Sequence, residues 1–249
     1  MAGKGLSQHV AKFLKALHAS RKNRAKEERV TVLNVYRTES RAPSDTCIIW
    51  MHGLGADASD MQGLAAALPQ GLTVNHVFLD APVRPVTLNN GQSMRAWFDI
   101  MDVGPGSRED TQGLTQSESM IREVMQEEIN RGIAPQNLFL AGFSQGGAMA
   151  LFTGLRTEGR LGGVIALSSW LPETTPQSSV LSTETPIFLG LGRYDPLVLP
   201  AWTRLSADML KARGYDRLCL REYAVEHGVC PEEVTDIAHW LRATIEETA

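Results

Sequence analysis

The sequence is poor in cysteine and contains no long apolar run. Its three cysteines, at positions 47, 219 and 230, match no metal-binding spacing, and an odd number argues against a disulfide framework. We therefore expect a reducing compartment, with the cytoplasm as the predicted localisation, and neither a metal nor a cofactor. No stretch of the chain approaches the roughly eighteen apolar residues that a membrane-spanning helix requires.

Charge is unevenly distributed along the 249 residues. The formal net charge is −4, but residues 1–29 contain eight Lys or Arg and two Glu, so the remaining residues carry about −10. An acidic body of this kind argues against nucleic acid as the main partner. The hydrophobic content of 43% and charged content of 21% are typical of a globular protein with a full core. The length favours one α/β domain, expected over residues 30–249.

The basic segment 1–29 is predicted to be an amphipathic extension of this domain. Its apolar residues follow the spacing of one helix face: Leu6, Val10, Phe13, Leu14 and Leu17. Three interpretations stay open. The segment is a helix that docks on the domain or frays in solution, a helix that makes peripheral contact with an anionic membrane, or a transit peptide for an organelle. No oligomeric state is predicted.

From residue 30 onward, predicted strands alternate with predicted helices. Strands are expected at 30–37, 46–51, 73–79, 138–141, 163–167, 186–191 and 217–223, and helices at 58–68, from 148, at 202–213 and at 231–245. A capping box, Thr115-x-x-Glu118, predicts that a further helix begins there and ends near Gly132. Residues 80–102 are long enough to form a binding loop. The alternation predicts an α/β class with a mainly parallel central sheet and helices on both faces.

The segment 142–146, Gly-Phe-Ser-Gln-Gly, carries the clearest chemical signal. It is a G-x-S-x-G pattern that follows an apolar strand and precedes a small-residue helix. The tight turn holds its serine at strained backbone angles, and glycine at each flank removes a Cβ that would clash. We predict Ser144 as a nucleophile. The alternative is a glycine-rich packing turn.

A serine nucleophile requires a base and an acid that orients it, and in α/β-hydrolases these follow in the order Ser, Asp or Glu, His. Two histidines follow Ser144. His239 lies in an amphipathic helix pattern, whereas His227 lies in a loop after a strand, so His227 is the predicted base. Asp195 follows another strand in Gly-Arg-Tyr-Asp-Pro and is the predicted acid. Its alternative is a solvated turn aspartate.

Acyl transfer also needs donors to the oxyanion. One is usually the amide that follows the nucleophile, here that of Gln145, and the other comes from an earlier strand–helix loop. The segment His52-Gly-Leu-Gly follows a buried strand, so the Leu54 amide is the predicted second donor. An ordinary tight turn is the alternative. His52 is expected to brace the loop.

Six segments in matching order resemble the acyl-protein thioesterase/carboxylesterase family, also called the phospholipase/carboxylesterase family, of the α/β-hydrolase fold. They are WMHGLGAD at 50–57, DAP at 80–82, RAWFD at 95–99, GFSQGG at 142–147, GRYDPLV at 192–198 and HGVCPEE at 227–233. The resemblance covers about residues 30–245, and the run 81–91 resembles bacterial-type carboxylesterases most. The sequence departs from the family pattern in two places. Residues 1–29 lie outside the family core, and Val225-Glu226 replaces a Met-Gly-type pair.

The resemblance implies a serine hydrolase with Ser144, Asp195 and His227 as its triad and with Leu54 and Gln145 as oxyanion donors. It also implies an acyl-binding groove formed by Leu88, Trp97, Trp170, Leu171 and Val198. The expected substrates are esters or thioesters of hydrophobic acyl chains, such as an S-acylated protein or a lysophospholipid. Alternatives are lysophospholipase or general short-chain esterase activity and, in a different class, a non-catalytic binding protein.

Overall fold

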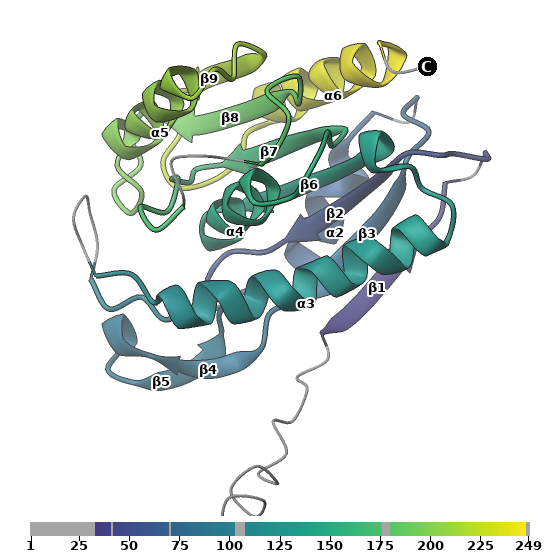
Figure 1. Cartoon of the computed structure of the whole chain (residues 1–249). Coiled ribbons are helices and arrows are strands. Elements are labelled where there is room, and N and C mark those ends of the chain that lie inside the picture. The colour runs from purple at the N-terminus through teal and green to yellow at the C-terminus, as the bar shows by residue number, and fades with distance from the viewer. Residues whose placement is uncertain (1–32, 41, 70, 103–107, 176–179, 248–249) are drawn as a thin grey trace, which may run out of the picture. The chain divides into compact units, whose positions relative to one another are not determined.

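The computed structural model describes residues 33–40, 42–69, 71–102, 108–175 and 180–247, so the predicted extension over residues 1–29 lies outside the described part. The strands are β1 (Asn34–Thr38), β2 (Cys47–Met51), β3 (Asn75–Asp80), β4 (Val83–Val86), β5 (Gln92–Arg95), β6 (Leu138–Phe143), β7 (Gly163–Leu167), β8 (Ile187–Gly192) and β9 (Leu218–Tyr223). The α-helices are α2 (Ala58–Ala67), α3 (Thr111–Asn130), α4 (Gln145–Leu155), α5 (Pro200–Ala212) and α6 (Pro231–Glu246) (Figure 1).

Seven of the strands form one sheet in the order β1-β3-β2-β6-β7-β8-β9. Only β1 in this sheet is antiparallel to its neighbour, and every other pair is parallel. Central strands such as β2 and β7 are buried along their whole length, as continuous apolar runs predict for strands covered on both faces. The predicted α/β class with a mainly parallel sheet is confirmed.

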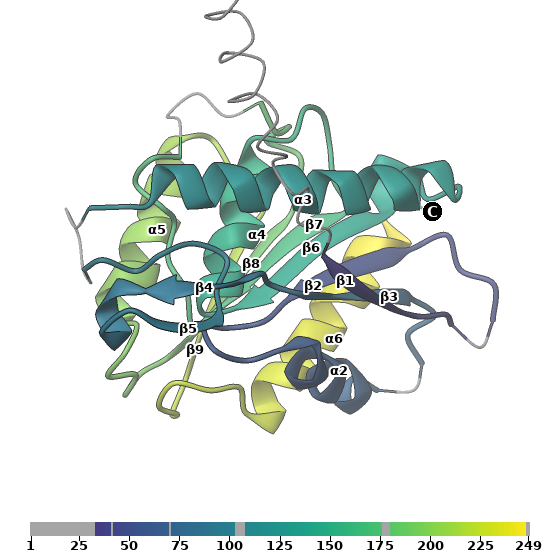
Figure 2. The same cartoon turned by 90° about the horizontal axis from the view of Figure 1, so that it is seen from below.

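Successive residues of each strand contribute to the cores on opposite faces of the sheet. In β2, Ile49 and Met51 pack in the core that includes residues of α3, α4 and α5. Ile48 and Trp50 instead join the core that includes residues of α2 and α6. Figure 2 shows α3 and α4 on one side of the sheet and α2 beside α6 on the other. The period of two along the strands therefore separates the two helical layers.

The predicted start of α3 is wrong. The helix begins at Thr111, and the side chain of Asp110 caps it by accepting a hydrogen bond from the Gly113 amide (2.8 Å). Thr115 lies inside the helix, where its hydroxyl donates to the Thr111 carbonyl (2.8 Å). Threonine can also bond to the carbonyl of the preceding turn from within a helix, so the Thr-x-x-Glu pattern also fits a helix interior. The predicted end is confirmed, since the C-cap is followed by Gly132 at φ 105°.

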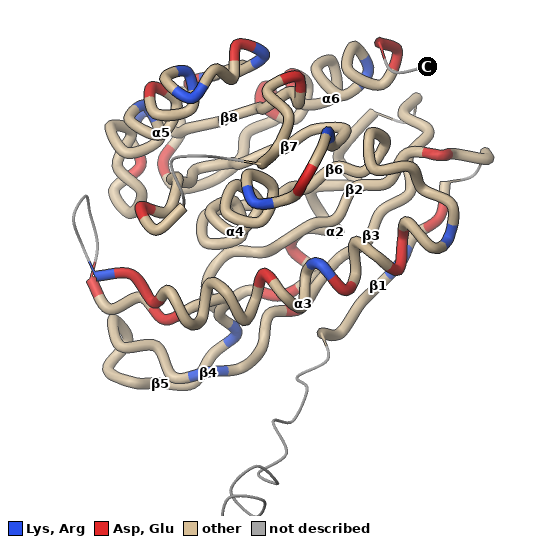
Figure 3. Tube along the Cα trace, in the orientation of Figure 1, with Lys and Arg blue, Asp and Glu red and all other residues tan. Residues whose placement is uncertain are grey.

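The long excursion between β3 and α3 folds into an antiparallel two-stranded ribbon of β4 and β5. It lies beside the carboxyl edge of the parallel strands, where the loops after β2, β6, β7, β8 and β9 also gather (Figures 1 and 2). Figure 3 shows acidic positions along α3 and in the segment just before it. In the part of the chain that the structure describes, no helix is long and apolar enough to cross a membrane.

Candidate active site

Ser144 occupies a sharp turn between β6 and α4. Its backbone lies at φ 54° and ψ −118°, a conformation that non-glycine residues adopt rarely and at a cost. A Cβ added to Gly142 would overlap the backbone of Gly146, and a Cβ added to Gly146 would overlap the carbonyl of Met51. Both glycines of the G-x-S-x-G pattern are therefore required by close backbone approach.

Three predicted site residues are joined by consecutive hydrogen bonds. Nε2 of His227 lies 3.0 Å from Oγ of Ser144, and its Nδ1 lies 2.7 Å from Oδ2 of Asp195. The second oxygen of Asp195 accepts from the amides of Leu197 (2.8 Å) and Val198 (2.9 Å). Asp195 is buried, and its carboxylate accepts a hydrogen bond from Nδ1–H of His227, so the Nε2 lone pair faces the serine hydroxyl. The arrangement can remove a proton from Ser144.

Backbone contacts fix the loops that carry these residues. The Arg193 amide donates to the Tyr223 carbonyl (2.8 Å), and the Tyr194 amide donates to the Val225 carbonyl (3.0 Å). These bonds tie the loop after β8, which carries Asp195, to the loop after β9, which carries His227. Val225, one of the two residues that depart from the family pattern, thus takes part in joining the two loops.

Two further contacts orient the serine and the histidine, and the sequence did not indicate either of them. The hydroxyl of Ser169, in the loop after β7, donates to the Ser144 carbonyl (2.8 Å). The ring of Phe143 lies against the ring of His227, with centroids 4.8 Å apart.

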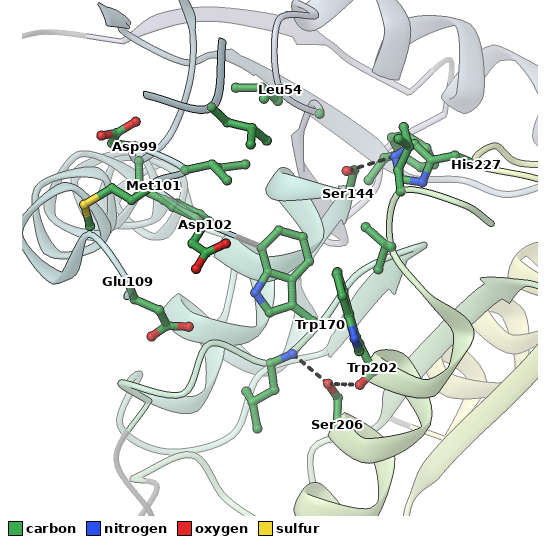
Figure 4. Close-up of a pocket in the computed structure, with 18 of the residues that line it drawn as sticks. Leu54, Asp99, Met101, Asp102, Glu109, Ser144, Trp170, Trp202, Ser206 and His227 are labelled. Carbon is green, nitrogen blue, oxygen red and sulfur yellow. Dashed lines mark hydrogen bonds between the residues drawn. The ribbon is translucent and has the colours of Figure 1, made fainter. Parts of the chain in front are cut away.

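The loop after β2 lies beside Ser144. A Cβ on Gly53 would be 3.5 Å from Cβ of Ser144. The Nδ1–H of His52 donates to the Gly53 carbonyl (2.7 Å), and its Nε2 accepts from the Ala81 amide (3.0 Å), so His52 braces the loop as predicted. Burial lowers the pKa of His52, which keeps the ring neutral as these two bonds require. Leu54 follows directly and faces the cavity next to Ser144 (Figure 4).

Gln145, the other predicted oxyanion donor, begins α4 and is fully buried. Its side chain accepts from the Trp97 amide (2.9 Å) and donates to the Phe98 carbonyl (2.8 Å). Gln145 therefore holds the chain after β5 against the serine turn, a contact that links the binding excursion to the predicted nucleophile. The pattern around the serine did not indicate this second role.

A cavity of about 860 Å³ opens beside Ser144 and His227. Four of the five residues predicted to bind the acyl chain line it: Leu88, Trp170, Leu171 and Val198. Figure 4 shows Ser144 and His227 at one end, Trp170 and Trp202 along the wall, and Asp99, Met101, Asp102 and Glu109 at the opposite end.

Trp97, the fifth of these residues, does not line the cavity. It is fully buried, and its indole N–H donates to the His52 carbonyl (2.9 Å). The structure thus gives Trp97 a bracing position behind the loop after β2. The two adjacent aromatic residues follow β5 at a bend of the chain, and Phe98 is the one that lines the cavity.

Helix α5 supplies a wall of the cavity that the sequence did not indicate. Trp202, Ser206 and Met209 line the cavity from one face of this helix. The Ser206 hydroxyl accepts from the Leu171 amide (2.8 Å) and donates to the Trp202 carbonyl (2.8 Å), which fixes the helix to the loop after β7 (Figure 4). The amphipathic pattern of α5 indicates that one face of the helix is apolar. It does not indicate whether that face packs on a core or lines a cavity, because both have the same periodicity.

Among the residues that the structure describes, no group of three or more His, Cys, Asp or Glu side chains is arranged to hold a metal ion. The acidic residues at the far end of the cavity have structural partners. Asp99 accepts from the amide (2.7 Å) and hydroxyl (2.6 Å) of Thr87, and Glu109 accepts from the amides of Glu173 and Thr174 (2.7 Å each). These bonds hold the two carboxylates in place at the polar end of the cavity.

Comparison with known proteins identifies the family. A model of the family described as Phospholipase/Carboxylesterase matches residues 35–245. The chain belongs to the phospholipase/carboxylesterase family. It is therefore a hydrolase of carboxylic esters or thioesters, as the sequence resemblance implied.

Two similar relatives are named acyl-protein thioesterases. Acyl-protein thioesterase 1 of Gibberella zeae is 34% identical over 211 residues, which is 78% of this chain and 88% of the relative. Acyl-protein thioesterase 1 of Saccharomyces cerevisiae is 34% identical over 217 residues, which is 82% of this chain and 94% of the relative.

Solved structures agree with this assignment. SOBER1 of Arabidopsis thaliana matches with a TM-score of 0.76 at 30% identity, over 80% of this chain and 99% of that protein. Acyl-protein thioesterase 2 of Zea mays matches with a TM-score of 0.73 at 26% identity, over 85% of this chain and 99% of that protein. The predicted α/β-hydrolase fold is thereby confirmed.

Proposed function

We propose that the protein is an acyl-protein thioesterase-like serine hydrolase that cleaves esters or thioesters of hydrophobic acyl chains through Ser144, His227 and Asp195. The observation that carries the proposal is the unbroken hydrogen-bonded series from Asp195 through His227 to Ser144, at the end of a largely apolar cavity. A serine hydroxyl is a weak nucleophile at neutral pH, and a base in this position activates it.

In the first half of the reaction, Oγ of Ser144 attacks the acyl carbonyl carbon while Nε2 of His227 takes the hydroxyl proton. Asp195 accepts from Nδ1–H and stabilises the imidazolium that forms. The tetrahedral intermediate collapses with cleavage of the bond to the leaving oxygen or sulfur, and His227 returns the proton to that atom. An acyl-serine remains.

We assign to the amides of Leu54 and Gln145 the hydrogen bonds that stabilise the negative charge on the carbonyl oxygen of the tetrahedral intermediate. Support comes from their positions, since Gln145 begins α4 immediately after Ser144 and Leu54 lines the cavity beside it. Within the described residues, the Gly55 and Ala56 amides donate to carbonyls of the protein and the Leu54 amide does not. One such donor lowers the barrier by about 3 kcal/mol.

In the second half, water takes the place of the leaving group. His227 removes a proton from the water, the hydroxide attacks the acyl-serine carbonyl, and the proton passes to Oγ of Ser144 as the carboxylic acid departs. The nucleophile is thereby regenerated, and the two halves use the same base and the same oxyanion donors.

The acyl chain is assigned to the cavity wall formed by Leu88, Trp170, Leu171 and Val198. These side chains are apolar, and burial of each methylene of an acyl chain against them contributes about 0.8 kcal/mol. The curated relatives are named acyl-protein thioesterases, so an S-acylated cysteine of a protein is the proposed substrate. Lysophospholipids and short-chain esters are the alternatives.

The proposal is tested with Ser144→Ala, assayed on p-nitrophenyl octanoate and with a fluorophosphonate probe. We expect the variant to lose both labelling and turnover. Ser93→Ala is the matched control because Ser93 is an exposed serine of β5 outside the cavity lining, and it should keep both. Turnover or labelling that survives in Ser144→Ala would contradict the assignment.

Two expectations about the cellular setting stay predictions. They are the cytoplasmic localisation and the peripheral membrane contact through residues 1–29. Co-sedimentation of the full chain with anionic and with neutral vesicles tests the second, since a basic amphipathic helix binds the anionic surface preferentially.

A further inference from the structure

A second cavity, of about 660 Å³, adjoins the catalytic one. The two cavities share Asp60, Phe143 and His227. The rest of the second cavity lies between α2 and α6, and its lining residues include Met61, Leu64, Ala67 and Val234. Figure 2 shows these two helices side by side on one face of the sheet. We call this cavity the α2–α6 groove.

The chemistry of the proposed reaction places the leaving group next to this groove. The tetrahedral carbon carries four substituents, namely Oγ of Ser144, the oxyanion, the acyl chain and the leaving atom. The oxyanion faces the amides of Leu54 and Gln145, and the acyl chain occupies the catalytic cavity. The leaving atom must reach Nε2 of His227, which returns its proton. Whatever is attached to that atom then continues past His227, whose ring forms part of both cavities.

The lining of the α2–α6 groove selects among leaving groups. Most of its side chains are apolar, and among the described residues that line it neither a lysine nor an arginine is present. Asp60, an exposed carboxylate, lies where the two cavities meet. The phosphodiester of a lysophospholipid head group would meet a like charge and no cation there, which disfavours it. An apolar amino-acid side chain would instead bury its surface against Met61, Leu64 and Val234.

From these observations we propose that the α2–α6 groove binds the polypeptide part of the substrate, with an apolar side chain next to the acylated cysteine seated between α2 and α6. This inference rests on the proposed function and extends it. The catalytic cavity recognises the acyl chain, and the groove recognises the protein from which the acyl chain is removed. Selectivity among protein substrates is therefore a property of α2 and α6.

Ala67→Trp tests the proposal because it fills the groove without removing a polar contact. Ala67 is an exposed residue that lines the groove at the end of α2, and Ala66 beside it is exposed but does not line the groove. Ala66→Trp is therefore the matched control. Both variants and the wild type are assayed on an S-octanoyl cysteine peptide with leucine neighbours and on p-nitrophenyl octanoate, which has the same acyl chain and a small leaving group.

We expect Ala67→Trp to lower kcat/KM for the peptide thioester about tenfold, the order of effect of blocking one anchoring side chain, and to leave the p-nitrophenyl ester within about twofold. Ala66→Trp should change neither. An equal loss on both substrates, or no loss on either, would overturn the proposal. Failure of the proposed hydrolase is distinguishable, since the wild type would then not cleave p-nitrophenyl octanoate.

Two further substrates identify the occupant. For the wild type, a peptide with glycine in place of the leucine neighbours should be a poorer substrate than the leucine peptide. For Ala67→Trp, the glycine and leucine peptides should be equally poor substrates. Such a loss of sensitivity measures coupling between the side chain and the groove. Octanoyl lysophosphatidylglycerol, whose head group carries only the negative charge of its phosphodiester, should be unaffected by Ala67→Trp. If its hydrolysis falls as much as that of the peptide, the groove takes the lipid head group and our proposal is wrong.

Discussion

Glu233 is a buried acid that should make the stability of the fold strongly dependent on pH. It lies in the first turn of α6 with 1% of its surface exposed, and its side chain points at Gly190 of β8. Among the described groups neither carboxyl oxygen has a hydrogen-bond partner of acceptable geometry. Burial raises the pKa of Glu233 to about 8, although the nearby backbone amide of Cys230 favours the charged form.

The sign and size of the effect follow from linkage between protonation and folding. Glu233 holds its proton in the folded protein up to about pH 8 and loses it in the unfolded chain above about pH 4.5. The folded state therefore binds more protons in this window, so the stabilising contribution present below pH 4.5 is lost as the pH rises through it. At about 1.36 kcal/mol for each pKa unit, ionisation of the acid in place costs roughly 5 kcal/mol above the window.

Glu233→Gln removes the ionisation and keeps the shape of the side chain. A free-energy change of 1 kcal/mol shifts the Tm of a chain of this size by about 2–4 °C. The difference in Tm between the variant and the wild type should therefore be roughly 10 °C larger at pH 9 than at pH 5. Glu232→Gln is the control, because it removes an exposed acid from the same helical turn. Thermal unfolding followed by circular dichroism at both pH values measures the difference. If all three proteins lose stability in parallel, Glu233 is ionised in the folded state and the reasoning fails.

Two further predictions concern the serine turn and the cavity wall. Gly146→Ala should destabilise the protein by more than about 2 kcal/mol in urea unfolding, since its Cβ overlaps the Met51 carbonyl. Gly63→Ala in α2, where a Cβ meets nothing within 4 Å, should stabilise it by about 0.5–1 kcal/mol, and equal effects would refute the argument. Trp170→Ala should lower kcat/KM by about 10- to 100-fold for an octanoyl ester and little for an acetyl ester, because it removes about 1.5–3 kcal/mol of apolar contact only from the longer chain. A uniform loss along the series would place Trp170 outside the acyl path.

The parts of the fold that could be predicted from sequence are those fixed by local pattern. Buried parallel strands are continuous apolar runs, so β2, β6, β7 and β8 were located to within a residue or two. The glycines beside Ser144 were predicted from the steric demand of one tight turn, and the structure shows the backbone contacts that impose it. Asp195 and His227 were chosen because each follows a strand, and the parallel sheet brings those strand ends to one edge.

What could not be predicted depends on contacts between segments far apart in the chain. The side chain of Gln145 bonds to residues 97 and 98, and Ser169 bonds to the carbonyl of Ser144, and no local pattern encodes either pairing. Trp97 and Phe98 are adjacent aromatic residues in the same predicted loop, so the sequence does not distinguish their roles. In the structure the Trp97 side chain bonds to the His52 carbonyl, whereas Phe98 lines the cavity. The burial of Glu233 is similar, because an acid in the first helical turn is ordinary by sequence.

The contacts around Ser144 indicate which parts of the site are rigid and which can vary. A residue at φ 54° costs about 1–3 kcal/mol and persists only where its surroundings hold it. Here the Ser144 amide donates to the Leu167 carbonyl (2.8 Å), and the Ser144 carbonyl accepts from the Ala148 amide (3.1 Å) and the Ser169 hydroxyl (2.8 Å).

These bonds come from β7, α4 and the loop after β7, all at the centre of the fold. Parts of the wall of the cavity beside Ser144 instead come from the excursion after β3 and from α5, and the wall of the α2–α6 groove comes largely from α2 and α6. Substitutions in those peripheral elements can therefore change which acyl chain or which leaving group is accepted, while the geometry of Ser144, His227 and Asp195 is kept.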